Sequence, residues 1–285
     1  MSRAQAHLRI SALDLSVNHG AQSVVKDFSF DMRIGECVAV LGANGAGKSS
    51  LLTALSGEYS KARISLFNAA LNRAAFMKGA VIMNGAPLLA MSPNQRARLR
   101  AVLPQHSTLT FNLVVEEVVQ MGAYPFPEAK PEQVSQWIGA SLLDADLAGL
   151  RCSKYSELSG GEQQRVQFAR VLVQARAIAY FQGHAWIFLD EPTASLDPRH
   201  QQLLMTKIHS LVKTLNFGVM IIMHDLNLAA YWCDRVMLMK DGVLIADDCP
   251  AKGLTAENLS NCFDMPMQVM THPINPNKLI VVADQ

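Results

Sequence analysis

The sequence predicts an α/β fold in which helices connect the strands of a parallel sheet, with a second, mostly helical lobe. Three observations support this prediction. Short apolar runs alternate with helical segments along the chain, a glycine-rich turn follows one of these runs directly, and residues 105–157 form a mostly helical stretch between two parts of the sheet. A continuous apolar run of strand length suits a strand that is buried on both faces of a parallel sheet.

The expected strands follow from apolar runs and from alternation, and turn dipeptides separate several of them. They cover residues 8–17, 28–32, 36–41, 80–83, 186–189 and 219–223, and a hairpin of 236–239 and 243–246 around Asp241-Gly242. The expected helices cover residues 49–56, 93–100, 114–121, 133–150, 159 to about 177, and 198–215. The segment from Glu58 to Gly79 is expected to be helical or irregular, and its role is open.

The composition of the chain excludes several classes of protein. With 285 residues, 50% of them hydrophobic, and a net charge of +1, the chain can form a large globular core, and nucleic acid is not a favoured partner. Its five cysteines form no CxxC pair and are expected to be incidental thiols, and its histidines lack metal-site spacing. We find no signal peptide and no apolar run of the ~18 residues that a membrane span needs.

A phosphate-binding loop is predicted by the segment Gly42-Ala-Asn-Gly-Ala-Gly-Lys-Ser49, which fits GxxxxGK[ST]. Glycines let successive backbone N–H groups point at phosphate oxygens, and the following helix directs its positive dipole end at the same anion. Lys48 can reach the β- and γ-phosphates, and the Ser49 hydroxyl can bind Mg²⁺. A glycine-rich turn without a ligand would not require a preceding strand and a following helix. The expected ATP contacts are Gly42, Asn44, Gly45, Ala46, Gly47, Lys48, Ser49 and Ser50.

A second acidic element ends the apolar run Trp186-Ile-Phe-Leu-Asp190-Glu191. A strand that ends in two carboxylates places them at the carboxyl edge of the sheet, where a phosphate loop also lies. Asp190 would hold Mg²⁺ through its water shell, and Glu191 would orient and deprotonate the attacking water. Alone, the pattern fits a solvated acidic turn better, and the phosphate loop is what favours the functional interpretation.

The segment Leu158-Ser-Gly-Gly-Glu-Gln-Gln-Arg165 narrows the class. Ser159 can cap a helix, and Gly160 and Gly161 can expose backbone N–H groups at its positive end, which makes a second anion site. A capping box of Ser159 and Glu162 is the simpler interpretation, but it does not explain two glycines, which are poor helix formers. In sequence and in position, this segment resembles the signature of ABC transporter ATP-binding subunits.

The resemblance to ABC ATPases implies a P-loop NTPase fold with a RecA-like parallel-sheet core, an antiparallel β lobe and an α-helical lobe. It spans about residues 8–263. As a single domain over 1–285, the chain would have its core and β lobe at about 1–104 and 163–270, its helical lobe at about 105–162 and a C-terminal extension at about 271–285. The resemblance also implies a head-to-tail homodimer in which the signature of each subunit, Ser159 to Glu162, faces the ATP of its partner.

Further family elements follow in order along the chain. Gln105 matches the Q-loop glutamine, which would contact Mg²⁺ together with Ser49 and Asp190 and sense the membrane partner. Ser195 and Asp197 match the D-loop at the dimer seam, and His224 matches the switch histidine at the γ-phosphate. Catalysis is thus assigned to Lys48, Glu191 and His224. Alone, His224 would be an ordinary strand-end histidine.

The chain departs from the family pattern at the adenine site, where the family usually has an aromatic residue near the first strand. The best match is His19, in Val17-Asn-His-Gly20, and an exposed turn histidine is the alternative interpretation. A histidine can stack on adenine, but with less area.

Within the family, the chain looks most like importer ATPases for iron-containing or corrin-like solutes, and most of all like the haem (hemin) importers. The segments that carry this likeness start at Val115, Phe168, Gln182 and His224. The resemblance implies two ATPase and two permease subunits, a periplasmic solute-binding protein, and a peripheral position on the cytoplasmic face of the inner membrane. Ferric-siderophore and cobalamin importers remain alternatives. An exporter, a soluble ABC ATPase acting on nucleic acid or ribosomes, and a catalytically dead module fit less well, because the chain has one near-neutral cassette, resembles importers in detail and keeps Lys48, Glu191 and His224.

Overall fold

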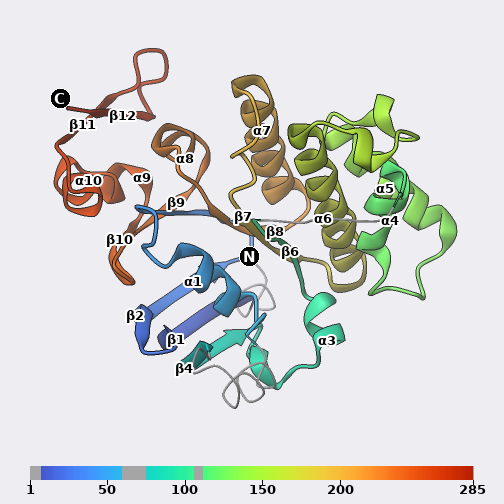
Figure 1. Cartoon of the computed structure of the whole chain (residues 1–285), viewed down its shortest axis with the longest axis horizontal. Coiled ribbons are helices and arrows are strands. Elements are labelled where there is room, and N and C mark those ends of the chain that lie inside the picture. Colours follow the sequence, from blue (N-terminus) through green and yellow to red (C-terminus); the bar gives the residue numbers. More distant parts are fainter. Residues whose placement is uncertain (1–7, 60–74, 106–111, 285) are drawn as a thin grey trace. The chain divides into compact units, whose positions relative to one another are not determined.

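The computed structural model of the chain describes residues 8–59, 75–105 and 112–284. The chain divides into two compact units, of which the first comprises Met1–Ser92 and Ile222–Gln285 and the second comprises Pro93–Ile221. Both ends of the colour range in Figure 1 therefore belong to the first unit, and the middle of the range belongs to the second.

An antiparallel sheet forms one part of the first unit. Its strands pair in the order β2-β1-β4-β5. Alternation along β2 buries Phe28, Phe30 and Met32 and exposes the residues between them, as a half-buried strand requires. The bounds are β1 Arg9–His19, β2 Gln22–Arg33, β4 Ala75–Met83 and β5 Ala86–Pro87.

Parallel pairing of β3 and β9 forms the second part of the first unit, and β10 pairs with β9 as a hairpin. All five residues of β3 are buried, which confirms the interpretation of its continuous apolar run. The predicted hairpin turn is confirmed, since Asp241 and Gly242 both have positive φ angles of 50° and 80°. The bounds are β3 Cys37–Leu41, α1 Lys48–Leu55, β9 Arg235–Lys240 and β10 Val243–Asp248.

The C-terminal part of the first unit contains three short helices and a hairpin that the sequence analysis did not predict. The side chain of Asn227 ties the hairpin to α8, because it accepts from Val281 N at 2.8 Å and donates to Val281 O at 3.2 Å. The bounds are α8 Leu226–Trp232, α9 Pro250–Gly253, α10 Ala256–Phe263, β11 Met267–Thr271 and β12 Leu279–Ala283. In the N-terminal part of the same unit, the short helix η2, Leu88–Ala90, follows β5.

The second unit contains three neighbouring strands in the order β8-β7-β6, and β6 and β7 pair in parallel. Every residue of β7 and of β8 is buried, as their continuous apolar runs predict. Parallel strands of this kind need crossover helices, which the chain supplies. The bounds are β6 Arg100–Leu103, β7 Ala185–Asp190 and β8 Phe217–Ile222.

The helices α4, α5 and η3 pack against α6, whose buried residues include Val166, Phe168 and Leu172. Gly183, in the left-handed region with φ 77°, ends this helix. The bounds are α3 Pro93–Ala97, α4 Val115–Gln120, η3 Met121–Ala123, α5 Pro131–Asp144, η4 Ala148–Leu150, η5 Tyr155–Glu157, α6 Gly160–Gln182 and α7 Pro198–Thr214.

The α/β fold with parallel strands and crossover helices is confirmed, and several element boundaries are wrong. Residues 75–79, expected to be helical or irregular, belong to β4, and Arg100, expected in a helix, begins β6. The helix α5 ends at Asp144 instead of 150, and α6 continues to Gln182 instead of 177. Most of the segment from Glu58 to Gly79 lies outside the described residues, and the division into lobes stays a prediction.

Candidate nucleotide-binding and hydrolysis site

The phosphate loop joins the end of β3 to the start of α1 in the first unit. Gly42, Gly45 and Gly47 have φ angles of 150°, 82° and 96°, a region that side chains with a Cβ rarely adopt. A Cβ on Gly42 would lie 2.2 Å from Met239 O, and one on Gly47 would lie 2.1 Å from Val24 O. Close backbone approach on two sides therefore requires glycine at these two positions.

Lys48 is almost completely buried, with 6% of its surface exposed. Its Nζ donates hydrogen bonds to the carbonyl oxygens of Gly42 at 2.8 Å and Ala43 at 3.0 Å. The ammonium group is thus folded back over the loop that it would share with a phosphate. Gly47, which has no side chain, is the N-cap of α1, so no capping side chain lies over the first turn of this helix.

His224 follows the last strand residues of β8. The N–H of Met223 donates to Val40 O at 3.2 Å, so His224 lies at the level at which β3 runs into the phosphate loop. The next residue, Asp225, caps α8 by accepting from Asn227 N at 2.8 Å and Leu228 N at 2.9 Å. The exposed His224 side chain is therefore held between a buried strand and a capped helix.

His19 ends β1 and has an aromatic neighbour that the sequence analysis missed. Its Nε2 lies 2.8 Å from the hydroxyl of Tyr59, and the two ring centroids are 6.2 Å apart. Burial raises the pKa of Tyr59, and a side-chain hydrogen bond with Ser50 opposes this rise. Ser50 is a predicted ATP contact on α1, so Tyr59 links the predicted adenine site to the phosphate loop. Its position inside an unassigned insertion gave no signal in the sequence.

The acidic pair lies at the end of β7 in the second unit. Asp190 is the last strand residue and is 5% exposed. Glu191 has a φ of 49°, which is unfavourable for a residue with a side chain and turns the chain sharply away from the strand. The Nε2 of Gln105 donates to Glu191 Oε2 at 3.2 Å. The structure thus brings the predicted Q-loop residue and the predicted base together.

The signature segment forms the capping box that the sequence allows. Ser159 N and Oγ donate to Glu162 Oε2 at 2.8 and 2.6 Å, and these bonds lower the pKa of Glu162. The two glycines have different surroundings. A Cβ on Gly160 would meet no heavy atom within 4 Å, whereas one on Gly161 would lie 3.0 Å from Ser195 O. The signature therefore packs directly against the D-loop of the same chain.

The D-loop leads into α7. Asp197 caps this helix, since its carboxylate accepts from His200 N at 2.9 Å, and Oδ2 lies 2.6 Å from His200 Nδ1. These backbone and side-chain bonds lower the pKa of Asp197. His200 was not singled out in the sequence, where it reads as one more polar residue in the first turn of a helix.

Comparison with known families decides the class. A family model described as ABC transporter matches residues 25–194, which is more than half of the chain. The chain belongs to the ABC transporter family. The matched range includes the phosphate loop, Gln105, the signature and the acidic pair.

Curated relatives of this ABC family member are similar over almost their whole length. The hemin import ATP-binding protein HmuV of Bordetella avium is 42% identical, covering 96% of this chain and 99% of the relative. The protein of the same name from Pseudomonas fluorescens is 39% identical, covering 95% of this chain and 99% of the relative. The one from Deinococcus radiodurans is 37% identical, covering 99% of this chain and 100% of the relative.

Solved structures show the same fold. A metal-chelate-type ABC transporter in an inward-facing conformation matches with a TM-score of 0.75 and 22% identity over 97% of both chains. A dimeric bacterial ABC transporter cassette matches with a TM-score of 0.70 and 21% identity, covering 85% of this chain and 98% of the other. Among the described residues, no helix combines the length and apolar character that a bilayer crossing needs.

In this ABC ATPase the predicted site residues divide between the two units. The first unit carries the phosphate loop, His19 and His224, and the second carries Gln105, Asp190, Glu191, the signature and the D-loop. The proposed Mg²⁺ ligands are a hydroxyl, an amide and a carboxylate, which supply the oxygen atoms that Mg²⁺ prefers. The nitrogen of Gln105 donates to Glu191, and its amide oxygen is the atom that could act as a ligand.

Proposed function

We propose that this chain is the ATP-hydrolysing subunit of an ABC importer that takes up haem (hemin). The observation that carries the proposal is the similarity to hemin import ATP-binding proteins over at least 95% of the chain. The residues assigned to the chemistry, Lys48, Glu191 and His224, are all present in this sequence.

The phosphates of ATP bind at the loop of the first unit. Backbone N–H groups at Gly45, Gly47 and Lys48 donate to the β- and γ-phosphates, and Lys48 leaves its carbonyl partners to contact the same oxygens. Ser49, Gln105 and Asp190 would hold Mg²⁺, which would supply positive charge that neutralises the phosphates. Stacking of adenine falls to His19, and the neighbouring Tyr59 enlarges the aromatic surface.

Hydrolysis depends on Glu191. Its carboxylate takes a proton from a water molecule that attacks the γ-phosphorus in line with the bond to ADP, and His224 donates a hydrogen bond to the γ-phosphate. The bond with Gln105 orients this carboxylate. A residue held at an unfavourable φ, as Glu191 is, has a backbone that its surroundings fix, which favours a defined position for the base.

Two copies of the chain form the working unit. Each signature, from Ser159 to Glu162, closes the ATP site of the partner subunit, with Ser195 and Asp197 at the seam. Two such subunits act with two permease subunits and a periplasmic solute-binding protein, on the cytoplasmic face of the inner membrane. ATP binding closes the dimer, and hydrolysis reopens it.

Reconstitution tests the proposal. The chain and its permease are placed in proteoliposomes, and ATP turnover is measured with the solute-binding protein loaded with haem, a ferric siderophore or cobalamin. We expect haem to stimulate turnover and to be transported, and Glu191→Gln to abolish both while preserving ATP-dependent dimerisation. Stimulation by a siderophore or cobalamin alone would reassign the solute, and turnover unaffected by Glu191→Gln would contradict the mechanism.

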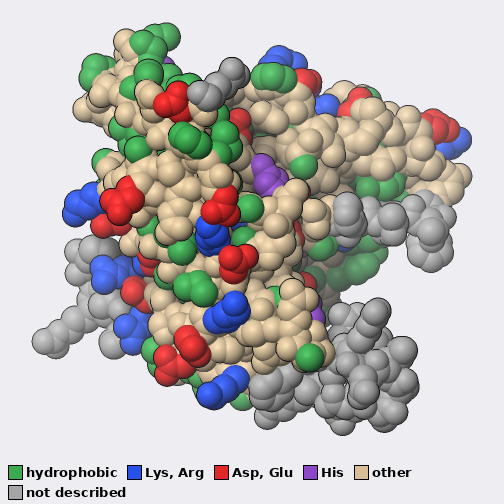
Figure 2. Space-filling view, turned by 60° about the vertical axis from the view of Figure 1, so that its left-hand side comes forward, with side chains coloured by type: hydrophobic (Ala, Val, Ile, Leu, Met, Phe, Trp, Pro, Cys, Tyr) green, Lys and Arg blue, Asp and Glu red, His purple; other side chains and the backbone are tan. Residues whose placement is uncertain are grey.

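The charge distribution favours a protein partner over a nucleic acid. On the face that Figure 2 shows, basic and acidic side chains are interspersed, in keeping with the net charge of +1. Binding to a phosphate backbone relies on clustered lysine and arginine.

A further inference from the structure

The signature and the D-loop are in contact through their backbones. The carbonyl oxygen of Ser195 lies 3.0 Å from the position of a Cβ on Gly161, and Leu196 Cδ2 lies 3.7 Å from it. The two segments therefore approach each other closely at Gly161.

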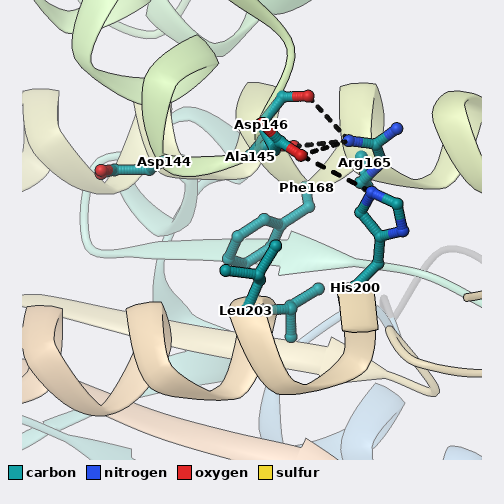
Figure 3. Close-up of a pocket in the computed structure, with 8 residues that line it drawn as sticks. Asp144, Ala145, Asp146, Arg165, Phe168, His200 and Leu203 are labelled. Atoms are coloured by element: carbon teal, nitrogen blue, oxygen red, sulfur yellow. Dashed lines mark hydrogen bonds and ion pairs between the residues drawn. The ribbon is translucent and has the colours of Figure 1, made fainter. Parts of the chain in front are cut away.

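A polar chain connects the D-loop to the helix that begins with the signature, and Figure 3 shows its part from His200 through Asp146 to Arg165. The imidazole of His200 lies with Nδ1 2.6 Å from Asp197 Oδ2 and with Nε2 3.6 Å from Asp146 Oδ2. The ring thus bridges the D-loop aspartate to a carboxylate beyond the end of α5. Its side chain is only 18% exposed, so the surroundings restrict its orientation.

The far end of this bridge is fixed to the signature helix. Arg165, in the second turn of α6, donates to the carbonyl oxygens of Asp146 at 2.7 Å and Ala145 at 3.3 Å and lies 3.7 Å from Asp146 Oδ2. Asp146 itself has a φ of 55°, a turn conformation that these bonds stabilise. Asp197 is therefore connected through His200, Asp146 and Arg165 to the helix that begins at Ser159.

We propose that His200 is a positioning residue that holds the D-loop to the signature, so that both reach the partner's nucleotide as one rigid element. This role rests on the proposed ATP-sandwich function. His200 does not touch the nucleotide and acts through Asp197. Replacing its side chain therefore affects closure of the dimer and turnover of ATP, and it leaves the ATP affinity of the single subunit unchanged.

The charges around the ring favour this bridge. Asp197 and Asp146 face its two nitrogens, and the acidic Glu162 also acts on it electrostatically, whereas Arg165 and Arg199 lie near Asp146. The two carboxylates thus face different nitrogens of the same ring, Asp197 at Nδ1 and Asp146 at Nε2. Asparagine at position 200 can replace the donor at Nδ1 but is too short to reach Asp146.

Matched variants separate the bridge from the helix cap. His200→Asn keeps the backbone N–H that Asp197 caps and removes the reach to Asp146, and His200→Gln restores a longer donor. Lys207→Met is the control, because Lys207 joins the same two helices, α7 and α5, through Asp144 at 2.9 Å without involving the D-loop. Thermal unfolding of each variant checks that it is folded.

ATP-dependent dimerisation in the Glu191→Gln background is the first readout, and ATP turnover of the permease-bound complex is the second. We expect His200→Asn to raise the protein concentration needed for dimerisation and to lower kcat, each about tenfold, with an unchanged KM for ATP. His200→Gln should recover part of the loss, and Lys207→Met should match the parent. Asp146→Ala should reproduce the loss of His200→Asn, and the double variant of the two should lose no more than either single variant.

The outcomes distinguish the two proposals. If the parent dimerises and turns over ATP and His200→Asn behaves like it, the positioning role is wrong and the proposed function stands. Additive losses in the His200→Asn, Asp146→Ala double variant would also overturn the bridge. If the parent itself neither dimerises nor hydrolyses ATP in the complex, the proposed function fails, and this role fails with it.

Discussion

The side-chain amide of Gln105 donates a hydrogen bond to the carboxylate of Glu191, with 3.2 Å between Nε2 and Oε2. The two residues are 86 positions apart in the sequence and are brought together by the parallel pairing of β6 with β7. A residue expected to sense the membrane partner therefore holds the residue expected to activate water. A shift of Gln105 would therefore change the orientation of the Glu191 carboxylate directly.

The first prediction concerns this hydrogen bond. Gln105→Ala removes the donor, so Glu191 becomes less well oriented, and we expect kcat for ATP to fall on the order of tenfold. The kcat of Gln105→Glu should fall further, because its carboxylate would repel that of Glu191. Steady-state ATP turnover checks both, with nucleotide binding as the control. Equal turnover in Gln105→Ala and the parent would remove Gln105 from the mechanism.

Much of the fold could be predicted because the signals are local. The continuous apolar runs at β3, β7 and β8 identify strands that are buried on both faces. The strand β6 was missed because it is only four residues long and follows the helix α3 after two residues. The hairpin of β11 and β12 was missed because its anchor, Asn227, lies 54 residues before Val281.

The residues of the candidate site also fall into two groups, those that local motifs predict and those that only the structure identifies. The phosphate loop, the signature and the acidic pair are short motifs, so the sequence alone predicts them. Tyr59 and His200 are functional candidates only because of what they contact, and those contacts, with His19 and with Asp146, join residues 40 and 54 positions apart. Local patterns carry no information about such pairs.

The second prediction tests the need for glycine in the phosphate loop. Gly47→Ala adds a Cβ 2.1 Å from Val24 O at a φ of 96°, so the loop must move, and we expect ATP affinity to fall by at least about tenfold. Gly35→Ala is the matched control, since its φ of 87° imposes similar strain but its Cβ would meet no heavy atom within 4 Å. Titration with a fluorescent ATP analogue measures both. Equal affinities in the two variants would refute the clash.

The third prediction concerns the aromatic pair. Tyr59→Ala removes a ring beside His19 and Ser50, and we expect the KM for ATP to rise up to about tenfold, the range that one aromatic contact supplies. Tyr59→Phe keeps the ring and loses only the hydroxyl, so its KM should stay near that of the parent. If both variants raise the KM for ATP to the same extent, the hydroxyl of Tyr59 contributes to binding and stacking of its ring does not.

The fourth prediction concerns acid stability. Hydrogen bonds from Arg151, one of them 2.8 Å long from Nε, lower the pKa of Glu116 at the start of α4. A lowered pKa means that this carboxylate stabilises the fold above its unfolded pKa of about 4.3 and loses that effect as the pH falls through the folded value. Both side chains are partly exposed, so the contribution is well under about 1 kcal/mol.

Urea unfolding of Glu116→Gln and the parent checks this sign. The parent should be slightly more stable at pH 7, and the difference should shrink below pH ~4. High salt should reduce the difference at pH 7, because the pair is exposed to screening. A difference that grows towards acid pH would contradict the assignment.

The ammonium group of Lys48 is bound by the carbonyl oxygens of Gly42 and Ala43, which belong to the loop itself. If ATP binds through Lys48 as proposed, its binding is an exchange reaction in which phosphate oxygens displace these two carbonyl oxygens. The loop is then a competitor for its own lysine. Departure of the products can be the reverse exchange, in which the lysine changes partners without passing through a state in which its charge is buried alone.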